Sequence, residues 1–498
     1  MKPENLLGVV IYLNVSLLIV FVNSSNSKKV PALQIKQPLT CQYKDFFYSY
    51  FSCDKFAKRS IYDDGKAHNI NKCAPFQLVN SSSPAVFLLY DVNSVEGFNL
   101  RRDVYIRMAV FLKSLRHRRH YENSFLVLPP FYQLYHWNLA STFRYRSKND
   151  INDDDILFWN HFFDLESMKR YTAVIDIWEY FEILRDCFGY KSNEIISINN
   201  AFRLKHFESM FLSGRFEEKF DIQRNCDQHF FVNGGAQFLS LYNNFTVRNG
   251  QCVEFQGSAG LLYDLFEKFP KRSDAKIHSI AIFNSETVLH DHWGGSEYWR
   301  ARRSMRFNSY LVQVANEFRN DIFNSTDEFD GTERPFDWQN EREHRNAKGG
   351  KYICGHLRRA DFVQGREETT PSLRSAATQI LVKLKELQIK NMFVSSDCTG
   401  QEFRSFKSYL SRYSVHRFTP SSAEERRRLK PGGIAIVDQA ICSNARYFIG
   451  SYESTFTYRI YEEREIMGFP QETTFNTFCK TPYETDKCAR NSHWPIVY

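Results

Sequence analysis

The feature that most constrains the fold is a regular alternation of two patterns in the second half of the chain. Short apolar runs predict buried strands, and each is followed by a longer stretch whose apolar residues recur with helical spacing. The expected strands span 352–357, 392–395, 415–418 and 447–449, and the expected helices span 372–387, 401–413 and 434–445, with a last helix from about Thr455. Repeated strand–helix units indicate a parallel sheet with helices on both faces.

The first half opens with the same kind of unit. Its expected elements are a strand over 86–90, a helix over 104–115, a strand over 125–128, a strand over 277–283 and a helix over 309–323. A loop over 91–102 separates the first strand from the first helix. The polar segments 140–160 and 185–200 are interpreted as insertions.

A charged segment with few aliphatic residues, 324–350, is the predicted boundary between two domains. We expect an N-terminal α/β domain over 85–335 and a C-terminal α/β domain over 345–498, whose parallel sheets face a central cleft. Ligands of such sheets bind at the carboxyl ends of the strands. Two domains with a cleft between them suit an enzyme that joins two substrates.

The N-terminus predicts entry into the secretory pathway. An apolar run over 6–22 follows Lys2 and precedes the small polar residues Ser24 and Ser25. This layout is typical of a cleaved signal peptide over 1–24, with an uncleaved signal anchor as the alternative. The polar segment 25–84 is interpreted as an N-terminal extension. After cleavage, we expect no stable insertion into a membrane.

A secretory route permits disulfides and glycosylation. The chain has 11 cysteines, an odd number, so at least one is unpaired or pairs with another chain. Their irregular spacing, without paired CxxC units, argues against a structural zinc site. Glycosylation sequons at Asn80, Asn244 and Asn324 predict modified surface loops.

The charge balance argues against a nucleic-acid partner. Lys and Arg number 65 against 57 Asp and Glu, for a formal net charge of +8. A nucleic-acid-binding surface would show cations clustered on one element. The densest runs, 116–119 and 426–428, are short and are interpreted as solvated helix faces. A few well-placed cations still suit a small phosphorylated ligand.

The stretch 93–103, NSVEGFNLRRD, lies between an expected strand and an expected helix. Gly97 would let the backbone approach a ligand closely. Glu96 would project from the end of the strand, where a catalytic base belongs. The alternative interpretation makes Asp103 a helix cap and Glu96 a partner of Arg101.

The stretch 356–362, HLRRADF, follows another expected strand. Adjacent side chains of an extended chain point to opposite faces, so at least one of Arg358 and Arg359 needs a partner or a pocket. A guanidinium group suits phosphate because it offers paired donors. The alternative is an ion pair, such as Arg359 with Asp361.

A third stretch, 450–456, joins a strand to a helix and is rich in hydroxyl groups. Free N–H groups at a helix start bind anions, although helix capping by Ser or Thr explains the pattern equally. Two acids, Asp438 and Glu463, lie on apolar helical faces. Each needs a hydrogen-bonding or cationic partner, either a structural ion pair or a recognised ligand.

Signals for a metal or for other enzyme classes are poor. The pair His290 and His292 lacks a third ligand, and the acidic run 153–155 lies in a polar segment. We therefore expect no metal. The chain also lacks the phosphate-binding GxxxxGK[ST] element and the GxSxG nucleophile elbow, which argues against P-loop kinases and common hydrolases.

Taken together, these stretches resemble the protein O-fucosyltransferases, and closely the type that acts on thrombospondin type 1 repeats. The resemblance covers about residues 85–498. It is carried by 88–93, 96–105, 289–292, 356–362, 432–433, 438–439, 454–456 and 462–466. The long first motif is highly specific, whereas each shorter motif would be weak alone.

The resemblance implies a GT-B-like fold of two Rossmann-like domains and a glycosyltransferase, a peptide-O-fucosyltransferase. It implies GDP-fucose as co-substrate, no metal or other cofactor, and inverting transfer to a Ser or Thr hydroxyl of a folded repeat. It also implies a location in the lumen of the endoplasmic reticulum. The alternatives are an O-fucosyltransferase for EGF-like repeats and a non-catalytic chaperone that binds thrombospondin repeats.

The resemblance also implies roles for individual residues. Glu96 is the general base, Arg358 stabilises the departing β-phosphate, and Glu463 orients the site. His356 and Leu357 contact the nucleoside, and Asp438 meets the guanine edge. The full set of implied donor contacts is Val95, Glu96, Gly97, Phe98, Asn99, His356, Leu357, Arg358, Asp438, Thr455 and Phe456.

The same resemblance implies the disulfides Cys226–Cys252 and Cys479–Cys488. Of the other cysteines, three lie in apolar contexts and are expected to be buried thiols: Cys354, Cys398 and Cys442. Four lie outside the family pattern and are expected to pair among themselves: Cys41, Cys53, Cys73 and Cys187.

Overall fold

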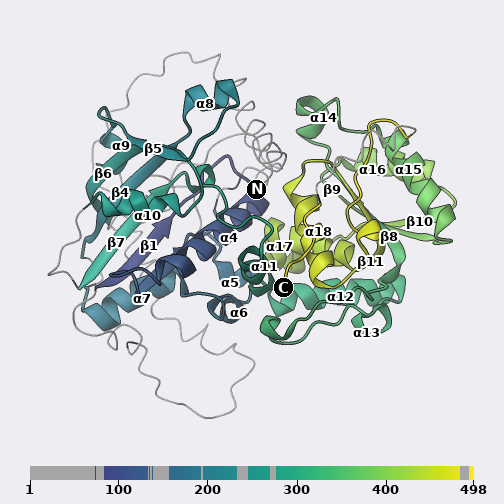
Figure 1. The fold of residues 1–498 in the computed structure, drawn as a ribbon. Coiled ribbons are helices and arrows are strands. Elements are labelled where there is room, and N and C mark those ends of the chain that lie inside the picture. Colours follow the sequence, from purple (N-terminus) through teal and green to yellow (C-terminus); the bar gives the residue numbers. More distant parts are fainter. Residues whose placement is uncertain are drawn as a thin grey trace, which may run out of the picture.

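A computed structural model describes residues 73, 84–132, 134, 137, 156–191, 194–232, 245–269, 276–482 and 493–498. The chain forms two α/β lobes, each built on its own sheet (Figure 1). The predicted signal peptide over 1–24 and the acidic run 153–155 lie outside the described residues. Across the described ranges, no helix is long and apolar enough to span a bilayer.

The first lobe contains a seven-stranded sheet in the order β3-β2-β1-β7-β4-β6-β5. Its strands are β1 (Ala85–Tyr90), β2 (Ser124–Leu128), β3 (Val174–Asp176), β4 (Ile196–Lys205), β5 (Lys219–Ile222), β6 (Phe245–Gln256) and β7 (Ile277–Phe283). All neighbours pair in parallel except β5 with β6. Strand β1 lies between β2 and β7, so that Leu88 is opposite Leu126 on one side and Ile280 on the other.

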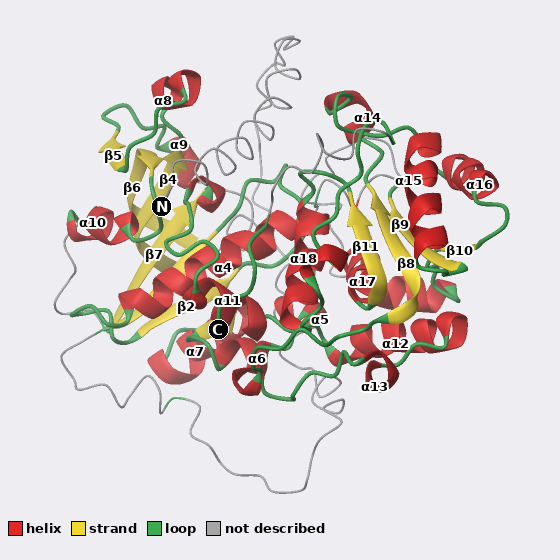
Figure 2. Ribbon diagram, turned by 45° about the vertical axis from the view of Figure 1, so that its right-hand side comes forward, coloured by secondary structure: helices red, strands yellow, loops and turns green. Residues whose placement is uncertain are grey.

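Helices cover both faces of this sheet (Figure 2). They are α4 (Phe98–Leu115), α5 (Trp159–Phe162), α6 (Leu165–Lys169), α7 (Ile177–Phe188), α8 (Glu208–Ser213), α9 (His229–Val232), α10 (Leu261–Glu267), the 3₁₀ turn η7 (Ser285–Thr287) and α11 (Ser296–Ser304). Alternate residues of β1 enter two different cores: Leu88 packs with α4, and Phe87 packs with α7. This alternation is why the run 86–90 is apolar without interruption.

The second lobe contains a four-stranded parallel sheet in the order β10-β9-β8-β11. Its strands are β8 (Gly350–Leu357), β9 (Asn391–Ser396), β10 (Ser414–His416) and β11 (Ala445–Gly450). Its helices are α13 (Asp327–Asp330), α14 (Phe362–Gly365), α15 (Leu373–Glu386), α16 (Gly400–Tyr409), α17 (Ala423–Ser443) and α18 (Thr455–Ile466), with the 3₁₀ turn η9 (Gln471–Thr473). The 3₁₀ turn η8 (Trp338–Asn340) packs against α11 of the first lobe. The predicted alternation of strands and helices is confirmed.

Helix α17 begins well before the expected position and is broken in the middle. Lys430 has a φ of 57° and a ψ of 168°, so the helix restarts at Pro431. Proline suits this first helical position because its N–H would have no partner there. The second half of α17 faces β8 and carries Asp438.

Helix α12 (Ser309–Phe323) packs against α17, and its Phe323 ring stacks on Tyr352 of β8 at 4.1 Å between centroids. By packing, this helix therefore lies with the second sheet. The domain limits at 335 and 345 stay a prediction.

One expectation about the first half was wrong. The segment 185–200 is not an insertion, because it ends α7 and begins β4, an inner strand of the sheet. Its polar residues are used within the sheet: the Asn199 side chain accepts a hydrogen bond from the Ser279 N–H at 2.8 Å. Cys73, which belongs to the segment interpreted as an N-terminal extension, forms a disulfide with Cys187 of α7.

The remaining cysteines give a mixed outcome. The Cys226–Cys252 disulfide is confirmed, and so is pairing of Cys73 with Cys187. Cys479 is disulfide-bonded, and its expected partner Cys488 lies outside the described residues, as do Cys41 and Cys53. Cys398 is a buried free thiol as expected, but Cys354 and Cys442 are joined to each other. The prediction of buried thiols at these two positions was wrong.

Candidate active site

The loop after β1 is held in place by Arg101 of α4. Its guanidinium group donates to the carbonyl oxygens of Val92 and Asn93, each at 3.0 Å, and its Nε donates to the Glu96 carbonyl at 3.4 Å. The Asp91 carboxylate lies 3.7 Å from the same group. Arg101 therefore hydrogen-bonds the Glu96 carbonyl and forms no ion pair with the Glu96 carboxylate, so the alternative that pairs the two side chains was wrong.

Glu96 is placed as a base would be, at the carboxyl end of a parallel strand. Its carboxylate has no hydrogen-bond or ion-pair partner among the residues that the structure describes. Burial and the neighbouring Glu286 carboxylate raise the pKa of Glu96 to about 7, against the opposing effects of Arg101 and Arg107. A pKa near the operating pH suits a general base.

Glu286 is a neighbour that the sequence analysis missed. It lies in η7, directly after β7, and its carboxylate accepts a hydrogen bond from the Asn93 N–H at 3.1 Å. Strands β1 and β7 are paired, so their carboxyl ends place the two glutamates on the same edge of the sheet. The segment 285–287 has no sequence pattern that could have revealed this role.

The residues after Glu96 begin α4. Gly97 is the N-cap of this helix, so Asp103 is not a cap; it lies inside the helix and bonds Arg107 at 2.6 Å. The side chain of Val95 is exposed, whereas the Phe98 ring is buried and packs on Phe162 at 4.9 Å. The Phe98 side chain is thus part of an aromatic core, so only the backbone of Phe98 could contact a sugar-nucleotide donor.

Asn99 connects the two lobes. Its side-chain oxygen accepts hydrogen bonds from Gln439 of α17 at 2.9 Å and from Arg102 at 3.2 Å. Arg102 also donates to the Gln439 oxygen at 2.6 Å. These three side chains join the start of α4, directly after the loop that carries Glu96, to the helix that carries Asp438.

Arg358 lies after β8, at the carboxyl end of the second sheet. Its guanidinium group pairs with Asp361 at 2.6 Å and with Asp397, and its backbone N–H donates to the Ser451 hydroxyl at 2.8 Å. The second arginine, Arg359, bonds Glu402 at 3.2 Å. The alternative that paired Arg359 with Asp361 was wrong, because Asp361 faces Arg358.

The predicted nucleoside residues lie together beside Arg358. The His356 ring is buried, stacks on the Phe456 ring at 4.3 Å, and bonds the Thr457 hydroxyl at 2.8 Å. Burial and the charge of Arg358 lower the pKa of His356 to about 3, so the ring is neutral. Leu357 is buried beside it, and its carbonyl accepts the Ser396 hydroxyl at 2.6 Å.

Thr455 begins α18, the helix whose start was predicted to bind an anion. The N-cap residue Ser454 makes no side-chain capping hydrogen bond, so the capping alternative was wrong for this residue. The helix start therefore keeps backbone N–H groups that a phosphate could accept from.

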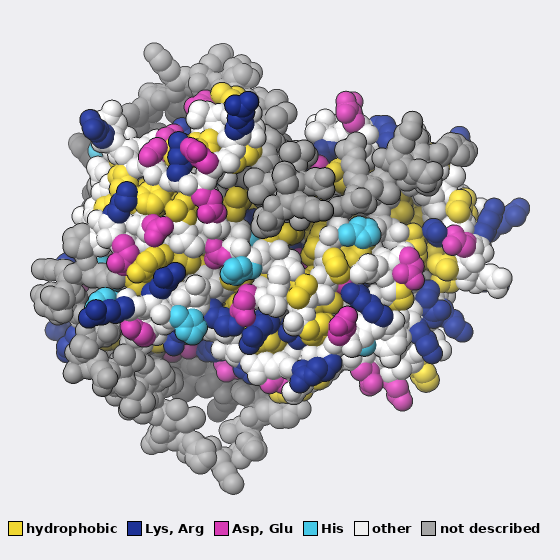
Figure 3. Space-filling model, in the orientation of Figure 1, with side chains coloured by type: hydrophobic (Ala, Val, Ile, Leu, Met, Phe, Trp, Pro, Cys, Tyr) yellow, Lys and Arg dark blue, Asp and Glu magenta, His cyan; other side chains and the backbone are white. Residues whose placement is uncertain are grey.

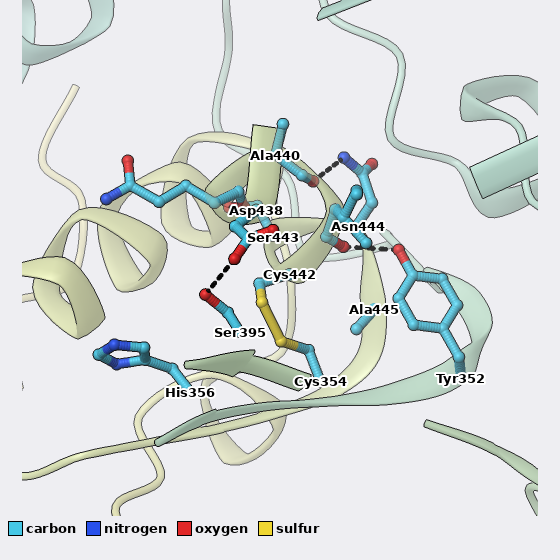
Figure 4. The surroundings of a disulfide bond; sticks show 12 residues. Tyr352, Cys354, His356, Ser395, Asp438, Ala440, Cys442, Ser443, Asn444 and Ala445 are labelled. Atoms are coloured by element: carbon cyan, nitrogen blue, oxygen red, sulfur yellow. Dashed lines mark hydrogen bonds between the residues drawn. A yellow bond between two sulfur atoms is a disulfide. The ribbon is translucent and has the colours of Figure 1, made fainter. Parts of the chain in front are cut away.

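Asp438 faces β9 from the second half of α17 (Figure 4). One carboxylate oxygen accepts the Ser395 hydroxyl at 2.8 Å, and the other is buried without a hydrogen-bond partner in the described chain. Burial raises the pKa of Asp438 to about 7, and Ser395 and Arg417 oppose that rise. The second oxygen is available to a ligand that brings N–H donors.

Glu463 lies two turns into α18, among arginines. Its carboxylate is 3.3 Å from Arg334 and 3.5 Å from Arg302. Burial acts to raise the pKa of Glu463, but these arginines, with Arg102 and Arg306, lower it overall. The neighbouring Glu462 pairs with Arg302 at 2.5 Å, so this network fixes α18 against α11 of the first lobe.

Two residues of the segment 290–292, in which a metal ligand was considered, have structural partners. His290 bonds the Asp103 carboxylate at 3.2 Å, and Asp291 accepts the Gly260 N–H at 2.5 Å. Charge is also mixed at the surface, because acidic and basic side chains are interspersed over both lobes on the face in Figure 3. Of the predicted glycosylation sites, Asn324 is exposed at the end of α12, and Asn80 and Asn244 lie outside the described residues.

Comparison with known proteins identifies the family. The model of the GDP-fucose protein O-fucosyltransferases matches residues 87–467. GDP-fucose protein O-fucosyltransferase 2 of Drosophila melanogaster is 46% identical over 422 residues, which cover 83% of each chain. The Homo sapiens protein of the same name is 36% identical over 430 residues, covering 84% of this chain and 92% of its relative.

The fold has a known counterpart. The crystal structure of POFUT1 in complex with GDP-fucose matches with a TM-score of 0.50 and 16% identity, covering 80% of this chain and 99% of the other. The prediction of an α/β, GT-B-like fold of two Rossmann-like lobes is confirmed. So are the resemblance and the assignment as a glycosyltransferase with GDP-fucose as donor: the chain belongs to the GDP-fucose protein O-fucosyltransferase family.

Proposed function

We propose that this chain transfers fucose, with inversion, from GDP-fucose to a Ser or Thr hydroxyl of folded thrombospondin type 1 repeats. The observation that carries the chemistry is the Glu96 carboxylate in the loop after β1. It has no hydrogen-bond or ion-pair partner among the described residues, and burial and Glu286 raise its pKa to about 7. The choice of acceptor rests on the resemblance of residues 96–105 to the type that acts on those repeats.

The mechanism follows from which groups are free and which are charged. A Ser or Thr hydroxyl is a poor nucleophile at neutral pH, so Glu96 takes its proton as the new bond to the anomeric carbon of fucose forms. The bond from that carbon to the β-phosphate oxygen breaks on the opposite face, which inverts the configuration. The leaving group is GDP.

The negative charge that develops on the β-phosphate needs compensation. Arg358 is suited to this because a guanidinium group makes two parallel hydrogen bonds to phosphate oxygens. The start of α18 at Thr455 adds backbone N–H groups and the positive end of the helix dipole. Glu463 acts as a positioning residue, since it holds α18 against Arg302 and Arg334.

The nucleoside is held by the second lobe. The guanine edge carries two N–H donors, which match the buried oxygen of Asp438 that lacks a partner. We infer that the His356 and Phe456 rings line the same pocket, and that Leu357 offers its backbone there, because its side chain packs into the core on the opposite face of β8. No step of this mechanism uses a metal ion, because arginine and a helix start supply the positive charge.

The experiment is incubation of the purified protein with GDP-fucose and a folded thrombospondin type 1 repeat, read by intact mass. One fucose should be added, also in the presence of EDTA. A reduced and unfolded repeat should remain unmodified. Loss of transfer in EDTA that one divalent ion restores would overturn the metal-free mechanism.

An EGF-like repeat tests the first alternative acceptor, since its preferential modification would reassign the enzyme. Binding of the thrombospondin repeat without transfer would support the chaperone instead. We further propose that the reaction takes place in the lumen of the endoplasmic reticulum, where disulfides such as Cys226–Cys252 form. To check this route, the protein is isolated from cells and treated with an N-glycosidase, which should lower its mass. A variant in which Asn80, Asn244 and Asn324 are all replaced should show no such change.

A further inference from the structure

The nucleoside pocket proposed above is built from one face of β8 and one side of α17. Alternate residues of a strand share a face, so Tyr352, Cys354 and His356 of β8 point the same way. Residues four apart on a helix share a side, so Asp438 and Cys442 are neighbours on α17. The two pocket residues therefore lie beside the two cysteines.

The cysteines are joined by a disulfide, with 5.1 Å between their Cα atoms (Figure 4). Both side chains are fully buried. The bond thus links the strand that carries His356, two residues after Cys354, to the helix that carries Asp438, one turn before Cys442.

This half of α17 is not a continuation of a straight helix. The break at Lys430 separates it from the preceding turns. Close to Cys442 it is held by the burial of Ile441 in the core and by hydrogen bonds. The Tyr352 hydroxyl donates to the Ile441 carbonyl at 2.6 Å, and Arg464 donates to the Ser443 carbonyl at 3.1 Å.

Asp438 needs to be placed accurately. Its buried, unpartnered oxygen gains most from a ligand whose donors meet it at hydrogen-bond distance, and a recognition site loses much of its effect when it is loose by about 1 Å. The Ser395 hydroxyl orients the carboxylate, but only the position of the helix backbone sets its distance from His356.

We propose that the Cys354–Cys442 disulfide is a positioning element of the nucleoside pocket, which fixes Asp438 relative to His356 for recognition of a guanine base. The inference rests on the proposed donor site. It assigns the bond a role in donor affinity and base selectivity in addition to stability.

The test is the double variant C354A/C442A, with calorimetry for GDP and for inosine diphosphate, which lacks the exocyclic amine of guanine. We expect GDP to bind about tenfold more weakly, as for the loss of one good contact to a charged group. The preference for GDP over inosine diphosphate should shrink, and the KM for GDP-fucose should rise more than kcat falls.

The first lobe offers a matched control. The variant C226A/C252A removes a disulfide that lies far from the nucleoside residues in sequence and in a different sheet. It should lower the melting temperature while GDP affinity and base preference stay as in the wild type. Equal affinity and preference in C354A/C442A and the wild type would overturn the proposal.

A second measurement avoids dependence on the folding of the variant. If the disulfide strengthens GDP binding by some factor, GDP must stabilise the disulfide against reduction by the same factor. Wild-type protein is equilibrated in glutathione buffers with and without GDP, and the free thiols are trapped and counted by mass. GDP should make the Cys354–Cys442 disulfide harder to reduce and should leave the reduction of Cys226–Cys252 unchanged. No shift at Cys354 and Cys442 contradicts the inference. Failure of the wild type to bind GDP would instead contradict the proposed donor site.

Discussion

Glu96 and Arg358 both lie in segments that follow a parallel strand, one in each lobe, and their side chains have opposite surroundings. The Glu96 carboxylate has no partner in the described chain, and a second carboxylate lies near it. The Arg358 guanidinium is already paired with Asp361 and Asp397.

The difference teaches how each group is prepared for its task. A general base needs a carboxylate without a partner and a pKa near 7. The Glu96 carboxylate has no partner among the described residues, and burial beside Glu286 raises its pKa to about 7. A phosphate-binding arginine must be correctly oriented before the donor arrives, and two carboxylates hold Arg358 in one orientation. Glu96 is suited to its role because its carboxylate has no partner among the described residues, and Arg358 is suited to its role because Asp361 and Asp397 orient its guanidinium group.

The largest expected effect is from Glu96→Ala, which would remove the free carboxylate. Fucose transfer should fall by about 10²–10⁴-fold, the usual contribution of a general base. The loop backbone is held through Arg101, so the protein should fold and bind GDP normally. Calorimetry with GDP and a transfer assay on one preparation check this. Near-normal transfer would remove Glu96 as the base.

Next in size is the contrast between Arg358→Lys and Arg359→Lys. Lysine keeps the charge but lacks the planar pair of donors, so Arg358→Lys should lose on the order of 10²–10³ in kcat, as for a lost oxyanion donor. Arg359→Lys is the control. Because the Arg359 side chain bonds Glu402 and the Pro371 carbonyl, this substitution should lower kcat much less. Equal turnover in Arg358→Lys and the wild type would reject the leaving-group role.

A smaller effect concerns pH. Because the pKa of Glu96 is raised to about 7, its base form is present above that pH and is lost as the pH falls. Below about pH 7 the transfer rate should therefore drop about tenfold per unit, as one essential group titrates. Glu286→Gln keeps an acceptor for the Asn93 N–H but removes the like charge.

In Glu286→Gln the acidic limb of kcat against pH should therefore move to lower pH, by up to about one unit. Arg101 and Arg107, the cations that oppose the rise, are unchanged in this variant. A profile that coincides with that of the wild type would mean that the Glu286 charge does not act on the base.

The smallest expected effect links the two regions. Asn99→Ala and Gln439→Ala each remove hydrogen bonds between the lobes and should lower the free energy of unfolding by about 1 kcal/mol. The double variant should lose less than the sum, because both side chains share the same bonds with Arg102. Urea unfolding of the four proteins measures the coupling. A change in GDP affinity in Asn99→Ala alone would instead support a direct donor contact.

The sequence by itself determined the architecture where burial leaves a pattern. A continuous apolar run revealed β1, since a strand covered on both faces has no polar side, and the alternation after residue 350 revealed the second sheet. The site residues Glu96, Arg358 and Asp438 were identified from their place at strand ends or on an apolar face, together with the family resemblance.

Only the tertiary structure decided the contacts between segments that lie far apart in the chain. Strand β4 was missed because its polar residues, such as Asn199, are satisfied only once β7 lies beside it. Glu286 reaches Glu96 only because β7 pairs with β1. Cys354 and Cys442, 88 residues apart, meet only when α17 packs on β8. Local periodicity records whether a residue is buried, but not which distant residue it meets, since many packings satisfy the same pattern.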